Sequence, residues 1–518
     1  MTGERAIGAA LLMGAAILSG CIAPPPARGI LIVSMDTTRF DRTSLGGARD
    51  TTPNLAALAR QGTRFEHAYA VANESVTSHA ALFTGRYPSE VAVADYATFA
   101  IPDGTPTLAS ALAAFGHATA AFTGGGHVVS DFGMHQGFER FESVQGDHTF
   151  GSFFDTVPSA LAWIHARDTP WFAFVHGYDA HTPYLQRGPF EHPWGDEGAT
   201  GRIEHIVADD IALEQLRGNL WFPDRTPGDF THAVGRDILA TDFYRHAVEP
   251  QPGERVEVLS AGEIAHLRDH YDSGLHYADV WLGQLLAGID LEHTLVIVLS
   301  DHGEDLLEHG FVNHRAGLWD STLHVPLVVA GPGIPAGEVV QEPVDLRSVV
   351  PTVLAWAGVP PLAGANAPDL RAKQTPRPVF AEGTLDELSV RTPDGDRLVL
   401  HDVGLAKGAP GLRGHPLTMG AASRYREPDS EPQPLSSDRS AVDLREVLAQ
   451  WRDILVPATQ AGAPVSAALR AELDARGYWV PEAAGGSETE LPSPGSRDGD
   501  AVERGSAVER STSGNTDP

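Results

Sequence analysis

Gly29-Ile30-Leu31-Ile32-Val33-Ser34-Met35-Asp36 is a continuous apolar run that ends in a carboxylate. An unbroken, β-branched apolar run of this length is typical of a strand buried on both faces of a parallel sheet. Residues 294–299, Thr-Leu-Val-Ile-Val-Leu, have the same character and lead through Ser300 into Asp301-His302-Gly303. Ligands gather at the carboxyl ends of parallel strands, so we expect Asp36, Asp301 and His302 to converge on one site that suits a divalent metal.

Helical and strand-like segments alternate around these two runs. Helices are predicted at 53–61, 107–115, 156–167, 261–289 and 346–357, and further strands at 118–122, 171–175 and 325–329. This alternation predicts an α/β fold with a mainly parallel central sheet and helices on both faces. Residues 378–402 have alternating, strand-like character on either side of Pro393-Asp394-Gly395-Asp396, which is a hairpin turn signal. This pattern predicts a small C-terminal antiparallel subdomain.

Changes in composition predict the domain boundaries. We expect a signal segment at 1–21, a proline-rich linker at 22–28, a catalytic domain at 29–375, a C-terminal subdomain at 376–480 and a disordered tail at 481–518. Residues of about 185–260 carry scattered charge and little periodicity, which predicts an insertion at the rim of the site. The tail is rich in Ser, Gly, Glu, Asp and Pro and has few apolar residues.

The N-terminus has the pattern of an export signal. Arg5 precedes an apolar stretch too short to span a bilayer, and Leu18-Ser19-Gly20-Cys21 resembles a bacterial lipobox. We therefore expect lipidation of Cys21 in an exported protein that is anchored to the cell-envelope membrane and faces the periplasm or the cell surface. The alternative is an ordinary signal peptide with an incidental cysteine.

Charge and cysteine content exclude several classes of protein. The formal net charge is −31, which argues against duplex nucleic acid as a partner, because such binding relies on neutralising phosphates. Cys21 is the only cysteine, so disulfide frameworks and multi-cysteine metal sites are excluded. Lys373 and Lys407 are the only lysines, which excludes a catalytic lysine elsewhere.

Ser75 opens a hydroxyl-rich segment, Ser75-Val76-Thr77-Ser78-His79, that predicts a short helix ended by Gly85. A hydroxyl at a helix N-terminus lies at the positive end of the helix dipole beside free backbone N–H groups, which suits an anionic ester. Capping of the helix by the same side chains is the alternative reading.

The order and spacing of these segments resemble the sulfatase family of the alkaline phosphatase superfamily. The matching segments are 33–41, 52–55, 75–88, 176–184, 300–304, 308–310, His314, 324–327, 344–360 and 476–478. The resemblance covers about residues 29–480 and implies an alkaline-phosphatase-like fold. It also implies one divalent metal ion, held by Asp36, Ser75, Asp301 and His302.

The resemblance also bears on which metal is bound. Thr37 stands where the family often has a second Asp. With one carboxylate fewer and an imidazole present, the site is expected to favour Mn or Zn, while Ca stays compatible with it.

The nucleophile segment departs from the family pattern. The family has Cys or Ser, then Pro or Ala two residues later and Arg four residues later, and oxidises the first residue to formylglycine. Here Thr77 and His79 occupy the two flanking positions, so we expect Ser75 to stay serine. A serine has no second hydroxyl with which to eliminate sulfate, whereas water can hydrolyse a phosphoserine, so phosphoester chemistry is favoured.

The expected function is therefore metal-dependent hydrolysis of sulfate or phosphate esters, including those of a glycan or a lipid, through a metal-bound Ser75 nucleophile. His79, one helical turn beyond Ser75, is expected to orient it. His181 and His314 fall where family members contact substrate, and either could protonate the leaving oxygen. Two alternatives remain: a transferase that moves a phosphoryl-linked head group onto an envelope glycan or lipid, and a non-catalytic pseudoenzyme that binds such esters.

Overall fold

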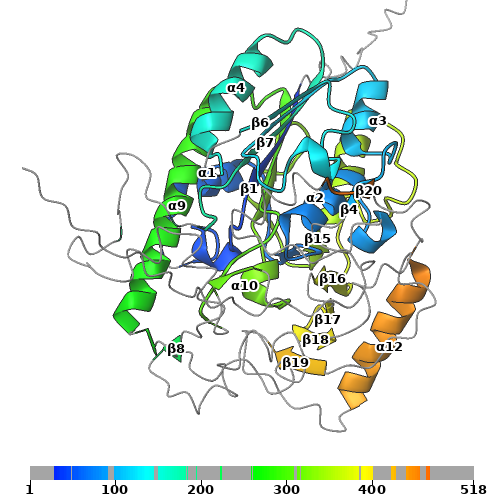
Figure 1. Ribbon diagram of the computed structural model, residues 1–518. Helices are drawn as coiled ribbons and strands as arrows, with labels where there is room; N and C mark the ends of the chain where they lie inside the picture. Colours follow the sequence, from blue (N-terminus) through cyan, green and yellow to red (C-terminus); the bar gives the residue numbers. More distant parts are fainter. Residues whose placement is uncertain are drawn as a thin grey trace, which may run out of the picture. The chain divides into compact units, whose positions relative to one another are not determined.

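The computed structural model describes most of the chain between residues 29 and 466 (Figure 1). The described ranges are 29–47, 49–91, 99–144, 150–182, 261–308, 312–314, 317–383, 387–400, 422–426, 439–455 and 463–466, together with Tyr184, Trp194, 222–223 and 258–259. The predicted signal segment with Cys21, the linker, most of the rim insertion and the tail lie outside these ranges, so they stay predictions. No helix in the described ranges is both long enough and apolar enough to cross a membrane.

An eight-stranded sheet forms the centre of the large domain. Strand β1 (Gly29–Met35) pairs in parallel with β10 (Thr294–Leu299) on one side and with β7 (Trp171–Gly177) on the other. The full order is β14 (Glu338–Val340), β2 (Thr63–Phe65), β13 (Leu327–Ala330), β10, β1, β7, β5 (Ala118–Thr123) and β6 (Arg140–Ser143). Strand β13 runs antiparallel to both of its neighbours. The mainly parallel sheet predicted from the sequence is confirmed.

Helices cover both faces of this sheet, as predicted (Figure 1). Leu31 and Val33 of β1 pack with residues of α1 (Pro53–Gln61), α4 (Phe153–His165) and α9 (Ala261–Ala287). Ile30 and Ile32 pack on the opposite face with residues of α2 (Ser75–Thr84), α3 (Leu108–Ala114) and α11 (Val349–Ala357). Successive strand residues point to opposite faces, so an unbroken apolar run contributes to two cores at once.

Some helix boundaries differ from the sequence pattern. Helix α4 begins at Phe153 rather than near 156, because Ser152 and Asp155 form a capping box that starts it one turn earlier. The predicted helix at 346–357 begins as a 3₁₀ turn, Leu346–Ser348, where the Asp345 side chain accepts from the backbone N–H of Arg347.

The remaining elements are short. They are β3 (Ala68–Tyr69), β4 (Phe99–Ala100), β8 (Phe222–Pro223), β9 (Val258–Leu259), β11 (Asp305–Leu306), β12 (Val312–Asn313), β15 (Val344–Asp345), β20 (Ala463–Pro464), α10 (Asp320–Leu323) and 3₁₀ turns at Phe40–Arg42, Pro88–Val91 and Ser130–Phe132.

A four-stranded antiparallel sheet follows the large domain, as the hairpin signal predicts. It consists of β16 (Val379–Gly383), β17 (Glu387–Arg391), β18 (Asp396–Leu400) and β19 (Ala422–Arg426). Gly395 adopts a φ of +88° in the turn between β17 and β18, a conformation that suits glycine. Helix α12 (Arg439–Ile454) packs its Trp451 against this sheet and against Tyr87 of the large domain.

A buried carboxylate ties α9 to the start of α1. The side chain of Asp279 accepts hydrogen bonds from the backbone N–H groups of Asn54 and Leu55, at 2.8 and 2.9 Å. Burial nevertheless raises the pKa of Asp279 to about 6, although those hydrogen bonds oppose the shift. The folded chain therefore favours the protonated form, and the stability that this carboxyl contributes below pH 4 is lost as the pH rises through about 6.

Replacing Asp279 by Asn should remove this pH dependence. We expect the difference in unfolding free energy, wild type minus Asp279→Asn, to fall by about 2 kcal/mol between about pH 4 and pH 7. Urea unfolding of both proteins at the two pH values measures it. A difference that stays constant would contradict the assignment.

Candidate active site

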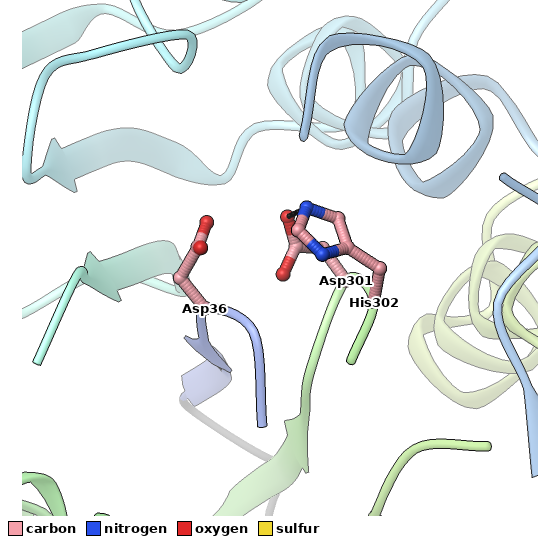
Figure 2. A group of neighbouring side chains, drawn as sticks. All are labelled: Asp36, Asp301 and His302. Atoms are coloured by element: carbon pink, nitrogen blue, oxygen red, sulfur yellow. Dashed lines mark ion pairs between the residues drawn. The ribbon is translucent and has the colours of Figure 1, made fainter. Parts of the chain in front are cut away.

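Three chemically active side chains meet at the carboxyl ends of β1 and β10. Asp36 directly follows β1, and Asp301 and His302 follow β10 after Ser300 (Figure 2). One ligand atom from each of the three lies within 4.8 Å of the others, and all three side chains are buried. The parallel pairing of the strands, with Ser34 opposite Leu299, accounts for this convergence.

Ser75 completes the cluster from the first position of α2. Its Oγ lies 3.1 Å from Nε2 of His302 and 3.4 Å from Oδ2 of Asp36. Glu74 before it is extended, and Gly85 ends the helix with a φ of +68°, as the sequence predicts. The nucleophile candidate therefore lies at a helix N-terminus, within reach of the three strand-end residues.

The cluster has the features of a cation site. Nδ1 of His302 donates to the carbonyl oxygen of Gly303 at 3.0 Å, so Nε2 carries its lone pair toward Ser75 and Asp301. An imidazole held in this way is the usual metal-binding tautomer. Oδ1 of Asp36 is buried and has no hydrogen-bond donor within the described residues. Two carboxylates, an imidazole and a hydroxyl form a donor set that fits a divalent cation.

The two carboxylates have opposite ionisation behaviour. Burial and the adjacent charge of Asp301 raise the pKa of Asp36 well above its usual range. Burial opposes ionisation of Asp301 as well, but His302, His79 and His176 outweigh it and lower the pKa of that carboxyl. Two buried like charges at this separation repel each other, and a cation between them would favour both ionised forms.

Two further histidines lie behind these carboxylates. Nε2 of His176, near the end of β7, is 2.9 Å from Oδ2 of Asp36. Nδ1 of His79 is 2.8 Å from the backbone carbonyl oxygen of Ser75 and 3.4 Å from Oδ2 of Asp301. Burial lowers the pKa of both imidazoles. His79 therefore faces Asp301 and the backbone of Ser75, and its role in orienting the nucleophile stays a prediction.

His314 lies beside the cluster, and His181 lies next to His314. The ring of His314 is 4.2 Å from that of His302 and 5.3 Å from that of His181, measured between centroids. Nδ1 of His314 is 3.2 Å from Glu304, and Nε2 is 3.7 Å from Glu74. Both glutamates are fully buried.

The structure adds three buried residues for which no role is predicted from the sequence: Glu74, Glu304 and His176. Their positions in the sequence are the only signals that point to them. Glu74 directly precedes the nucleophile candidate, Glu304 ends the Asp-His-Gly-Glu motif, and His176 opens the matching segment 176–184.

The backbone after Asp36 is held in a strained conformation. Thr37 has a φ of +54°, which is rare for a β-branched residue. The hydroxyl of Tyr271 on α9 donates to the carbonyl oxygen of Thr37 at 2.6 Å and accepts from the backbone N–H of Arg39 at 3.0 Å. The Thr37 hydroxyl donates to the carbonyl oxygen of Asp36. These bonds fix the loop that carries the first carboxylate.

An α/β sheet with carboxylates, an imidazole and a serine hydroxyl gathered at its strand ends defines a class of ester hydrolases. Within that class the chain belongs to the sulfatase family, because the Sulfatase family model matches residues 28–359.

Curated relatives agree with this family. Arylsulfatase K of Danio rerio is 32% identical over 223 residues, which cover 41% of this chain and 38% of that protein. The chain thus spans about two fifths of that relative. An N-acetylglucosamine-6-O-sulfatase of Bacteroides thetaiotaomicron is 24% identical over 382 residues, covering 64% and 67%.

Solved structures share the fold. A phosphonate monoester hydrolase from Silicibacter pomeroyi superposes with a TM-score of 0.61 at 16% identity, covering 82% of this chain and 94% of that one. A protein solved with its substrate D-glucosamine-2-N,6-O-disulfate superposes with a TM-score of 0.59 at 16% identity, covering 82% and 97%. The predicted family and fold are confirmed.

Removing the Tyr271 hydroxyl should loosen the Asp36 loop. We expect Tyr271→Phe to lower the unfolding free energy by about 1–2 kcal/mol and to weaken divalent-metal binding several-fold, because the strained Thr37 loses its anchor. Thermal melts with and without Mn²⁺ measure both effects. Tyr277→Phe, on the same helix, is the control and should keep the metal-induced shift; equal shifts in all three proteins would contradict the role of Tyr271.

Proposed function

We propose that this protein hydrolyses esters through an unmodified Ser75 and prefers phosphate esters to sulfate esters. The observation that carries the proposal is the position of the Ser75 hydroxyl, within 3.4 Å of both Asp36 and His302 at the N-terminus of α2. A nucleophile in this position can attack a phosphorus atom whose non-bridging oxygens face the same cation and helix end.

The residues around Ser75 support an unmodified serine. Thr77 donates its hydroxyl to the carbonyl oxygen of Glu74, and His79 contacts the carbonyl oxygen of Ser75. Both contacts are local to the first turn of α2. The Pro and Arg of the sulfatase maturation signal are absent at these positions.

The proposed reaction has two steps. Oγ of Ser75 releases its proton to solvent and forms a bond to phosphorus while the bond to the leaving oxygen breaks, and His314 or His181 gives that oxygen a proton, which the imidazole then regains from solvent. Water then attacks the phosphoserine, and the proton that it loses returns to Oγ as phosphate leaves. A divalent cation held by Asp36, Asp301 and His302 would stabilise negative charge on the phosphoryl oxygens and lower the pKa of the serine hydroxyl. Mn and Zn suit this donor set better than Ca.

The names of the relatives favour a sugar ester as substrate. One relative is an N-acetylglucosamine-6-O-sulfatase, and a structural neighbour was solved with its substrate D-glucosamine-2-N,6-O-disulfate. We propose that the substrate is an ester on a glycan or lipid of the cell envelope. This location rests on the predicted lipidation of Cys21.

The chemical state of Ser75 separates phosphoester from sulfatase chemistry. Trypsin should release the peptide Phe65–Arg86, and its mass in protein from the native host should match unmodified serine. A peptide lighter by two hydrogens would show formylglycine and would overturn the phosphoester preference.

Activity assays complete this test. We expect Ser75→Ala to lower turnover of an aryl phosphate by about 1,000-fold or more, because the covalent step is lost. Aryl sulfate, aryl phosphate and a phosphonate monoester are compared at one metal concentration. Thr84→Ala, at the last residue of α2, is the control for folding of the helix, because the Thr84 hydroxyl donates within the helix to the carbonyl oxygen of Ala80. Full activity of Ser75→Ala on every ester would refute the nucleophile.

The metal role of the cluster is tested by one substitution. We expect the wild type to bind one divalent ion per chain and Asp301→Asn to bind it about 100-fold more weakly, since a direct ligand loses its charge. Equilibrium dialysis with metal analysis measures this. Asp279→Asn also neutralises a buried carboxylate but lies outside the cluster, so it should bind metal as the wild type does. Equal metal binding by Asp301→Asn and the wild type would refute the site.

A further inference from the structure

His176 lies in the sheet next to the strand that carries Asp36. In the parallel pairing of β7 with β1 it is the partner of Ser34, two residues before Asp36. Its side chain is fully buried, and its Nε2 is 2.9 Å from Oδ2 of Asp36. Within the described residues this contact is shorter than the one between the same carboxylate and the hydroxyl of Ser75, which is 3.4 Å.

The hydrogen bonds of the ring define its tautomer. The backbone N–H of Gly124 donates to Nδ1 of His176 at 3.3 Å, so Nδ1 must carry a lone pair. Nε2 therefore carries the hydrogen and donates it to Oδ2 of Asp36. Oδ1, which has no hydrogen-bond donor within the described residues, is left for a cation. One oxygen of the carboxylate therefore accepts the hydrogen bond from His176, and the other is available as a metal ligand.

The surroundings leave the ring little freedom to turn. Tyr178 packs edge-on against it at 4.5 Å, and His79 does so at 5.2 Å, between ring centroids. Gly124 can approach because it has no side chain: a Cβ there would meet the carbonyl oxygen of Gly151 at 2.3 Å. The N–H that selects the tautomer therefore depends on a glycine.

His79 lies beside the second carboxylate but donates its hydrogen bond elsewhere. Its Nδ1 donates to the carbonyl oxygen of Ser75 and lies 3.4 Å from Oδ2 of Asp301. Both rings are completely buried and contact each other edge to face. Each carboxylate of the cluster is thus backed by a buried imidazole.

We infer that His176 is a positioning residue that orients Asp36 to bind a divalent cation. The inference rests on the proposed metal role of the cluster. Hydrogen bonds from outside the ligand shell fix the direction of a ligand and raise its affinity, and their loss typically weakens metal binding by about 10- to 100-fold.

Two substitutions separate the hydrogen bond from the volume of the ring. His176→Phe keeps an aromatic ring between its neighbours but removes the donor, whereas His176→Gln places an amide N–H near the position of Nε2. We expect His176→Phe to bind Mn²⁺ or Zn²⁺ about 10- to 100-fold more weakly and His176→Gln to recover most of the affinity. Competition with a chromophoric chelator measures affinity without any substrate, and metal-induced thermal shifts give a second readout.

The matched control is His324→Phe. His324 bonds through Nε2 to the carbonyl oxygen of Glu66 at 2.8 Å and stacks on Phe40, so the substitution also removes a ring hydrogen bond. Its metal affinity should equal that of the wild type. If His176→Phe does not fold, His176→Asn replaces it. The shorter Asn side chain places its amide nitrogen near the position of Nδ1, too far from Asp36 to donate a hydrogen bond.

The possible outcomes distinguish this inference from the proposed function. Wild-type affinity in His176→Phe, or in His176→Asn where that variant replaces it, overturns the positioning role while the metal site stands. Equal weakening in the Phe and Gln variants overturns it as well, because the donor would then not matter. A wild type that binds no divalent ion refutes the proposed function itself and the inference with it.

Discussion

The parallel pairing of β1 with β10 is the constraint on which the rest of the site depends. It places Asp36 and Asp301 at neighbouring strand ends, buried and close enough to share a cation. Two carboxylates in such a place repel each other and have lost the solvation of water. The histidines around them, the tautomer of His302 and the fit to a divalent ion all reduce the free-energy cost of this one juxtaposition.

The sheet keeps the two repelling carboxylates close together because its central strands are packed on both faces. Alternate residues of β1 belong to two separate apolar clusters, one with α1, α4 and α9 and one with α2, α3 and α11. Moving one strand end away from the other would disturb both clusters, and close-packed interiors resist such shifts. The strain at Thr37 is sustained in the same way, by a hydroxyl on the buried face of α9.

The sequence predicted the parts of this site that depend on local pattern and on the parallel direction of the strands. Residues 294–299 form a strand with the predicted ends, Gly85 ends α2, and Asp36 meets Asp301 because parallel strands end at the same edge. His176 was not assigned a role, since its contact with Asp36 depends on which strand lies next to β1, and local patterns do not specify strand order. The contact of His79 with Asp301 was not predicted either, because a spacing of four residues places His79 near the Ser75 backbone but does not show which residues lie across the helix.

The replacement of Arg by His79 changes the electrostatics of the site. An Arg at this position would bring a permanent positive charge to the carboxylates and the nucleophile. Burial lowers the pKa of His79, so near neutral pH its ring is uncharged and acts as a hydrogen-bond donor. Thr37, in place of a second Asp, removes one negative charge from the same region. The two departures from the family pattern therefore compensate in charge, and a cation held by Asp36, Asp301 and His302 would add positive potential toward an anionic ester.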